Sequence, residues 1–313
     1  MAGLRVAGRL ANAFVLDLVK LGGHRRDVAD ALVRAAVVHA NLAHLIRDGE
    51  LQTRYAGLDQ DPPDELRRPA SINAIATSLS LPFETVRRRV GGLAEAGICA
   101  VTPKGVIVPQ AATSSPPYRA ALQFQYEKLR ALYERLRAID VVQPRQAAAL
   151  WKGDPPVRLV GRLVVEFVLR FTEPVLEQVP DPVTTLTLLE IILANTEGLP
   201  DDEGGEEGKQ VSAFVPDWRR APVTVSALRT RLGIPNETLR RHVSGLCEAG
   251  LCRPVERGYI VPADALSRPE LLAFMLRNHA NLTRMFAGLG HAGVLASWEQ
   301  TGTGNGLGDA AGG

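Results

Sequence analysis

Cysteine is scarce in this sequence of 313 residues. The three cysteines, Cys99, Cys247 and Cys252, are odd in number, and no two of them have the CxxC spacing of a zinc or redox motif. This usage argues against a disulfide framework and a metal site, and it favours a reducing cytoplasm. We interpret Cys247 and Cys252, which stand five residues apart across an expected helix end, as small apolar residues.

Long hydrophobic runs are also missing. The most apolar stretch, residues 159–171, is too short for a membrane span, and Arg162, Glu166 and Arg170 interrupt it. Because these charges recur every four residues, they predict one polar stripe on a buried helix. The apolar run at the start of the chain also contains charges and makes a poor signal peptide. We therefore expect no membrane partner.

Catalytic motifs are absent as well. The sequence contains no recurring Ser-His-Asp set, no phosphate-binding P-loop and no zinc spacing. We therefore expect neither an enzyme nor a bound cofactor, and the sequence names no small-molecule effector. The formal net charge of +2 says little about partners, and 46% hydrophobic with 22% charged residues is ordinary for a soluble globular protein.

What the sequence does contain is a long internal repeat. Residues 82–109 and 235–262 align at an offset of 153 without a gap, and sixteen of the 28 positions are identical. The offset recurs near the start of the chain, and Asn41 matches Asn195 after one inserted residue. A repeat of this length is one structural unit used twice. It divides the chain into repeats at 1–150 and 153–290, for which we expect separate cores, and a glycine-rich tail, 291–313, expected to be disordered.

Each repeat has local signals for two helices and a hairpin. In the first, Ser71 is an N-cap candidate for a short helix, and a second helix is predicted from Pro82, as its first residue, to residue 96. Gly97 is expected to end that helix in the left-handed conformation. Two short β-type runs around a glycine-containing turn follow and predict a hairpin. The second repeat has the same plan, with Thr224 as the cap.

The repeated segment is the basic part of a nearly neutral chain. Residues 67–109 carry six basic and two acidic side chains, a balance of +4, and residues 219–262 carry eight basic and three acidic ones, a balance of +5. Such a local excess is typical of a surface that contacts phosphates. The interpretation of Arg87 to Arg89 as a merely solvated face is weakened by the recurrence at Arg240 and Arg241.

This plan resembles the winged helix-turn-helix of bacterial transcription regulators of the DeoR, GntR and IclR groups. In that pattern a small residue lies within the first helix, a glycine-like residue in the turn and an aliphatic one six residues later, here Ala76, Ser80 and Val86. The resemblance covers about 40 residues of each repeat and implies that the second helix enters the DNA major groove. The second repeat has Arg229, Gly233 and Leu239 at these positions, and Arg229 departs from the pattern.

The candidate DNA-binding residues follow from this resemblance. Arginine can donate two hydrogen bonds to the major-groove edge of guanine, and cationic side chains at the hairpin tip neutralise phosphates. Arg89 lies nearer the buried edge of its helix than its neighbours do. The candidates in the first repeat are Phe83, Glu84, Thr85, Arg87, Arg88, Arg89 and Lys104, and those in the second are Asn236, Thr238, Arg240, Arg241, His242 and Arg257.

Helices are expected to flank each unit. Residues 5–20 and 27–47 precede the first unit, and 157–177 and 183–196 precede the second; helices at 116–139 and 268–289 follow them. The fold class is therefore mainly α, with two tandem winged helix-turn-helix units at 67–109 and 219–262. The apolar stripe of 116–139 is expected to complete a core. Regulators use C-terminal helices of this kind to form dimers, so a homodimer through the flanking helices is also expected.

The function that these features predict is sequence-specific binding to double-stranded DNA, with transcription regulation on the nucleoid in the cytoplasm. Two alternatives stay open, because tandem winged helices also serve as scaffolds in chromosome segregation and in replication initiation. Differences between the repeats, Phe83 against Asn236 and Arg89 against His242, predict that the two units have unequal roles.

Overall fold

The order of helices and strands repeats once along the chain. The computed structural model describes residues 2–23, 28–143, 150–179, 181–201 and 214–304. The first repeat contains α1 (Ala2–Gly23), α2 (Val28–Leu42), η1 (Ala43–Ile46), α3 (Gly49–Arg54), η2 (Asp64–Leu66), α4 (Ile72–Ser78), α5 (Phe83–Glu95), β1 (Ala100–Thr102), β2 (Gly105–Ile107), α6 (Gln110–Thr113) and α7 (Pro116–Ala138).

The second repeat follows the same order. It contains α8 (Val157–Gln178), α9 (Pro182–Ala194), η3 (Asp217–Arg219), α10 (Val225–Leu232), α11 (Asn236–Glu248), β3 (Arg253–Val255), β4 (Gly258–Ile260), α12 (Ala263–Leu266) and α13 (Pro269–His291), and α14 (Val294–Gly304) follows it. The prediction of a mainly helical chain with two small antiparallel hairpins is confirmed. Both hairpins have the same register, since Ala100 pairs with Ile107 as Arg253 pairs with Ile260.

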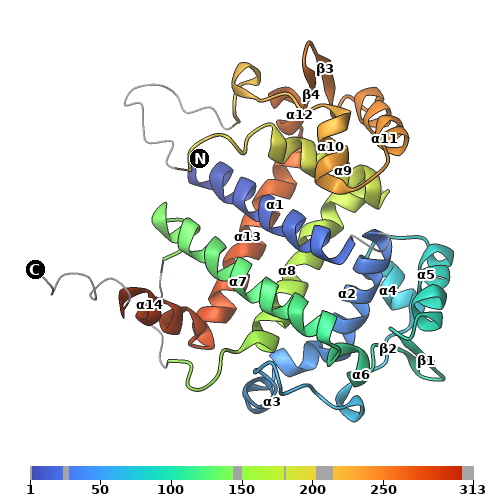
Figure 1. Ribbon diagram of the computed structural model, residues 1–313, viewed down its shortest axis with the longest axis vertical. Coiled ribbons are helices and arrows are strands. Elements are labelled where there is room, and N and C mark those ends of the chain that lie inside the picture. The colour runs from blue at the N-terminus through green and yellow to red at the C-terminus, as the bar shows by residue number, and fades with distance from the viewer. Residues whose placement is uncertain (1, 24–27, 144–149, 180, 202–213, 305–313) are drawn as a thin grey trace, which may run out of the picture.

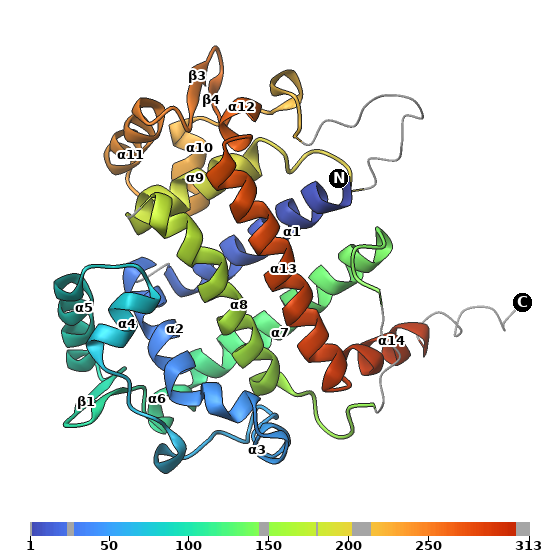
Figure 2. The same ribbon diagram turned by 180° about the vertical axis from the view of Figure 1, so that it is seen from behind.

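Four long helices cross at the centre of the molecule (Figures 1 and 2). They are α1 and α7 from the first repeat and their counterparts α8 and α13 from the second. Helix α1 packs on α7 and α13, and α8 packs on α13 and α7. The packing of α1 on α7 within the first repeat corresponds to that of α8 on α13 within the second, and the packing of α1 on α13 between the repeats corresponds to that of α8 on α7. The two halves of the chain are therefore related as the two copies of a symmetric dimer would be.

The first helix of each repeat packs against the other repeat. Helix α1 packs on α9, and α8 packs on α2. From α8, the Arg162 guanidinium donates to the Tyr55 carbonyl at 2.8 Å, and Arg158 donates to the Leu58 carbonyl at 2.8 Å. From α1, Arg9 donates to the Thr196 carbonyl at 2.9 Å. The repeats are therefore interleaved by both apolar packing and hydrogen bonds.

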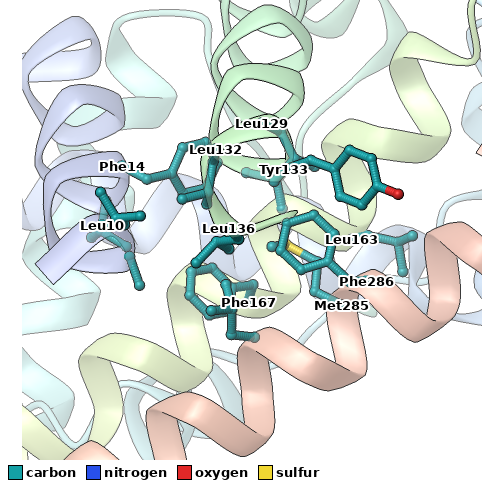
Figure 3. Close-up of a cluster of buried hydrophobic side chains, with 14 of the residues drawn as sticks. Leu10, Phe14, Leu129, Leu132, Tyr133, Leu136, Leu163, Phe167, Met285 and Phe286 are labelled. Atoms are coloured by element: carbon teal, nitrogen blue, oxygen red, sulfur yellow. The ribbon is translucent and has the colours of Figure 1, made fainter. Parts of the chain in front are cut away.

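The largest core belongs to both repeats. Figure 3 shows side chains of the four central helices meeting there, among them Phe14, Tyr133, Phe167 and Phe286. Burying one large apolar side chain stabilises a fold by about 1.5–3 kcal/mol, so this cluster is a major part of the folding free energy. The expectation of two separate cores is wrong in this respect: each repeat has a smaller core around its hairpin, and the central core joins them.

The predicted helix caps and buried face are confirmed, and the prediction for Pro82 is wrong by one position. Ser71 accepts from the Ala74 amide at 3.1 Å and Thr224 from the Ala227 amide at 3.1 Å, so both N-caps are confirmed. Gly97 has a φ of +69° beyond the end of α5, as a left-handed helix end requires. Pro82 is the N-cap of α5 and not its first residue. The predicted buried face of α5 is also confirmed, since Val86, Val90 and Leu93 are at most 3% exposed.

A buried asparagine holds the hairpin of each unit. The Asn41 amide donates to the Arg68 and Val106 carbonyls, and its Oδ1 accepts from the Val108 amide at 2.9 Å. In the second repeat Asn195 makes the corresponding bonds, to the Ala221 and Tyr259 carbonyls and from the Val261 amide. The chain before α4 and before α10 also bridges the hairpin, through Ala70–Val106 and Val223–Tyr259. Each hairpin is thus tied to its helices from two sides.

The end of the chain differs from the prediction of a disordered tail. Residues 294–304 form α14, in which Trp298 is buried against α7. Its indole Nε1 donates to the Tyr126 hydroxyl at 2.7 Å, and the two rings meet edge to face at 5.5 Å. The packing of Trp298 against α7 thus stabilises a helix in a segment whose glycine-rich composition predicted disorder. The rest of the predicted tail, 305–313, lies outside the described residues.

Candidate nucleic-acid interface

Helix α5 presents an exposed, charged face opposite its buried one. Arg87 Nε lies 2.8 Å from Glu84 Oε2, one helical turn earlier, with 60% and 70% of the two side chains exposed. An exposed pair of this kind contributes at most about 1 kcal/mol, so the guanidinium can exchange one anion for another at little cost. Phe83, at the start of the helix, is 45% exposed.

Arg88 is the most available cation on α5. It is exposed, and within the described residues it makes no hydrogen bond or ion pair. The neighbouring Val86 and Val90 point into the core, which fixes the rotation of the helix and turns Arg88 outward. All five guanidinium donors of Arg88 are therefore open to an external anion or to a base edge.

Arg89 does not belong to this outward face. Its Nη1 lies 3.2 Å from Asp30 Oδ1 on α2, and 23% of the side chain is exposed. The pair ties α5 to the helix behind it. Arg89 is therefore turned toward α2 and away from the face that carries Arg88, because on the 3.6-residue wheel it lies close to the buried edge.

Helix α11 repeats this division of roles. Arg240 forms an exposed pair with Glu237 at 3.6 Å, and Arg241 is exposed without a hydrogen bond or ion pair among the described residues. His242 is turned inward: its Nδ1 lies 2.7 Å from Thr184 Oγ1 and 3.4 Å from Asp181 Oδ1, with 11% of the side chain exposed. His242 thus takes the place of Arg89 and, like it, faces away from the outward arginines.

The remaining candidates divide by exposure. Lys104 and Arg257 stand exposed at the two hairpin tips, and neither has an ion pair in the part of the chain that the structure describes. Thr85 and Thr238 are half-buried on the flanks of their helices. Asn236 is also half-buried, and its Oδ1 is buried without a hydrogen-bond partner among the described residues. The cations at the tips are thus more accessible than the polar residues at the helix starts.

Two basic residues of these basic segments are buried inside the protein. Arg67 and Arg220 are 4% and 5% exposed, although the local charge balance counts them toward a phosphate-contacting surface. Arg67 Nη1 donates to the Val108 carbonyl at 2.9 Å, and Arg220 Nε lies 3.5 Å from Asp217 Oδ1. The charge that each unit offers to a partner is therefore smaller than its sequence count.

The two charged helices lie at one edge of the molecule. In both views α5 and α11 are on the same side, and α14 lies toward the other (Figures 1 and 2). The hairpins β1–β2 and β3–β4 lie beside them, each with its unit. The two-fold relation of the central bundle makes the positions of α5 and α11 equivalent.

Two exposed residues near or within the second unit are not among the DNA-binding candidates named from the sequence. Trp218 in η3 is 84% exposed, and its counterpart in the first repeat is Glu65. Arg229 on α10 is exposed, whereas its counterpart Ala76 is buried. The departure of Arg229 from the small-residue pattern is the signal that marks this position, because an arginine at a buried place without a partner would be costly. No comparable signal marked Trp218.

Comparison with protein-family models, with curated proteins and with solved structures finds no match to this chain. Within the described ranges, none of the helices combines the length and the apolar character that crossing a membrane requires.

Proposed function

We propose that the chain binds double-stranded DNA sequence-specifically and regulates transcription on the nucleoid in the cytoplasm. The proposal treats α2, α4, α5 and the β1–β2 hairpin as one winged helix-turn-helix unit, and α9, α10, α11 and β3–β4 as the second. One observation carries it. Arg88 and Arg241, at corresponding positions, are both exposed and unpaired among the described residues, on two helices at one edge of the molecule.

The chemistry of these side chains suits a duplex. The major groove admits a helix, and the arginine fork matches the O6 and N7 atoms of guanine. Arg87 and Arg240 leave weak exposed pairs to reach phosphates, while Lys104 and Arg257 at the hairpin tips neutralise the backbone. Binding that uses several phosphate contacts weakens steeply as salt rises, so affinity is expected to fall strongly between low and physiological ionic strength.

Under this proposal one chain supplies two DNA-recognition helices, α5 and α11, which differ in sequence. Phe83 stands at the start of α5 and Asn236 at the start of α11, so the two half-sites of the DNA are expected to differ in sequence. The apolar stripe of α7 lies inside the central core, where Leu129 and Leu136 are fully buried. The flanking helices thus join two units within one chain, and we propose that DNA binding does not require a homodimer.

The proposal is tested by removing the two outward arginines. We expect R88A/R241A to lose most of its affinity for duplex DNA in a salt-titrated anisotropy assay on genomic fragments, because each bidentate contact contributes about 1–3 kcal/mol. The matched control is R277A/R284A, which removes two exposed cations from α13. Undiminished binding by R88A/R241A, with the fold intact by circular dichroism, would overturn the assignment of α5 and α11.

A second candidate function is a protein-binding scaffold in chromosome segregation or replication initiation. Three exposed apolar side chains in the two units favour it, namely Phe83, Val101 at 60% and Trp218 at 84%. This candidate predicts no DNA affinity at physiological salt and a partner whose capture is lost in W218A. Genome-wide immunoprecipitation separates the cases, since a regulator gives promoter peaks, an initiator an origin peak and a scaffold without DNA contact none.

A further inference from the structure

An apolar cavity of about 100 Å³ lies in the second half of the molecule. Helices α1, α8, α9 and α13 enclose it, with Val6, Phe171, Leu188 and Phe274 on its walls. Its polar groups are few and come from separate elements, which is typical of a site that fixes the orientation of a small ligand. A cavity of about 150 Å³ holds benzene, and this space is smaller, so it suits only a small, compact apolar body.

Buried polar atoms without partners line this cavity. The side chain of Arg220 is 1% exposed, and its Nη1 has no hydrogen-bond acceptor among the described residues. Its Nε also lacks a hydrogen bond, although Asp217 Oδ1 is 3.5 Å away. Burial, opposed by Asp217 and reinforced by Arg5, lowers the pKa of Arg220. A buried guanidinium with unused donors is costly, which indicates that a bound acceptor completes the site.

The first repeat shows what normally faces this arginine. Arg67 is the counterpart of Arg220, and Asp61 lies beside it with its Oδ1 3.1 Å from Arg67 Nη2. The same carboxylate pairs with Arg158 at 3.1 Å and accepts from the Thr113 and Ser114 hydroxyls at 2.7 and 2.6 Å. Four donors thus converge on one internal carboxylate.

The second repeat has no such carboxylate. The residue in the place of Asp61 is Phe214, and Leu266 stands where Thr113 offers its hydroxyl. The alignment of the repeats is secure here, because Asp64 caps the amide of Gln110 just as Asp217 caps that of Ala263. The cation is retained while its internal anion is replaced by an apolar ring.

The second repeat has also gained space at the same place. The corresponding cavity of the first repeat measures about 20 Å³, where Tyr118 and Leu122 occupy the positions of Leu271 and Met275. A Cβ placed on Gly161 would lie 2.5 Å from Leu122 Cδ2, whereas a Cβ on its counterpart Gly8 would have no neighbour within 4 Å. The first cavity is closed by the protein itself, and the second is left open.

We propose that the cavity of the second half binds a small monocarboxylic acid. Its carboxylate accepts from Arg220, in the role that Asp61 has in the first half, and its aliphatic or aromatic body fills the space between α1, α8, α9 and α13. A second anionic group is disfavoured, because the other unpartnered atoms of the wall, Asn12 Oδ1 and Asn278 Oδ1, are acceptors. This proposal does not rest on DNA binding.

The ligand class is tested by calorimetric titration of the whole chain, without DNA, using hexanoate and benzoate. Hexan-1-ol and benzyl alcohol are the matched neutral probes, with apolar bodies of the same kind. We expect at least one acid to bind about tenfold or more tightly than its alcohol, since charge-assisted hydrogen bonds are the stronger ones. We also expect that acid to raise the melting temperature. No heat and no melting shift from either acid, or equal affinity for acid and alcohol, would overturn the proposal.

Three variants locate the site. R220M is expected to lose the preference for acid over alcohol, and F214D to lose acid binding because it supplies the internal carboxylate of the first repeat. Since both change buried residues, G8L provides a variant that leaves the cation in place. It fills the open side of the cavity, so it is expected to lose binding of both probe types without losing melting temperature. G91L, on the open face of α5, is the control. Unchanged acid binding in G8L and R220M would contradict the assignment.

Discussion

At the scale of single residues, buried polar side chains decide how each unit is held together. Asn41 and Asn195 are 0% and 1% exposed, and each joins three backbone groups that would otherwise lie unpaired inside the protein. An apolar residue of the same size could fill the space, but it could not make these hydrogen bonds. The match between these asparagines in the sequence therefore reflects one structural task done twice.

We predict that N41A and N195A each lower the free energy of unfolding by about 1–3 kcal/mol, because buried carbonyl and amide groups lose their partners. The measurement is chemical denaturation followed by circular dichroism. N73A changes an exposed asparagine on α4 and is expected to stay within about 0.5 kcal/mol of the parent. A similarly small effect in N41A would show that the clamp contributes little.

A second prediction at this scale concerns the cysteines. Burial raises the pKa of the Cys99 thiol to about 11 and that of Cys252 to about 12. Because the thiolate is the reactive form, both are expected to resist iodoacetamide at pH 8 in the folded protein and to react after unfolding. Peptide mass spectrometry reads out the labelled sites. Fast labelling of Cys99 in the native state would contradict the prediction.

At the scale of elements, the position of a helix is set by what lies behind it. The buried stripes of α5 and α11 fix their rotation, and pairs at the inner edge, Arg89 with Asp30 and His242 with Thr184, fix them to α2 and α9. An ion pair and a hydrogen bond thus both fix the rotation of a helix. The ion pair in one unit and the hydrogen bond in the other leave the neighbouring arginines, Arg88 and Arg241, facing outward.

The contact of α2 with α8 leads to a prediction about pH. Burial lowers the pKa of His39 on α2; Glu166 opposes the shift, and Arg170 and Arg47 reinforce it. Below the ordinary value of 6.5 the unfolded chain therefore binds a proton that the folded chain resists. The stabilisation that comes from keeping His39 uncharged is fully present above pH 6.5, and it is lost as the pH falls toward the lowered pKa of His39 in the folded protein. We expect H39Q to have a shallower loss of melting temperature than the parent between about pH 7 and 5.

Differential scanning fluorimetry across that range provides the measurement. H291Q changes an exposed histidine at the end of α13 and is the control. His44, whose pKa burial also lowers, contributes in the same direction, so H39Q is expected to reduce the pH dependence without removing it. An identical pH profile in H39Q and the parent would exclude His39 as a contributor.

At the scale of the whole molecule, the chain is built like a symmetric dimer whose two copies have been joined. Helices α1 and α8 each pack on the opposite repeat, and one central core includes side chains from both. A protein in which the halves share their largest core cannot lose one half and keep the other intact. The interleaving therefore couples the stability of the two peripheral units.

We predict that the chain unfolds in one cooperative transition. F167A, in the shared core, is expected to lower the free energy of unfolding by about 3–5 kcal/mol and to increase hydrogen exchange in α4 and α5 as well as in α10 and α11. Calorimetry and exchange mass spectrometry measure the two effects. Two separate transitions, or faster exchange confined to one unit, would show that the halves fold independently.

Local features of the fold were predictable because their causes are local. Ser71 and Thr224 each cap a helix by accepting from the amide three residues later, and Gly97 ends α5 through its own backbone freedom. The helical wheel placed Arg89 near the buried edge of α5, but it could not name Asp30 as its partner, and no local pattern predicted that Arg67 is buried against the Val108 carbonyl. Asp30 and Val108 are distant in sequence from these arginines, so only the folded chain brings them together.

The amino-acid sequence by itself determined that this protein is one unit used twice, with a buried stripe and an outer row of arginines on each of two helices. Periodicity, capping and repetition suffice for that, because they act within a few residues of the chain. Only the tertiary structure decided that α1 and α8 each pack against the other repeat and that α5 and α11 lie at the same edge of the molecule. It also decided that Arg220 lacks the neighbouring carboxylate that Arg67 has. These outcomes depend on which side chains meet across the central core, and a meeting of distant residues exists only once the chain has folded.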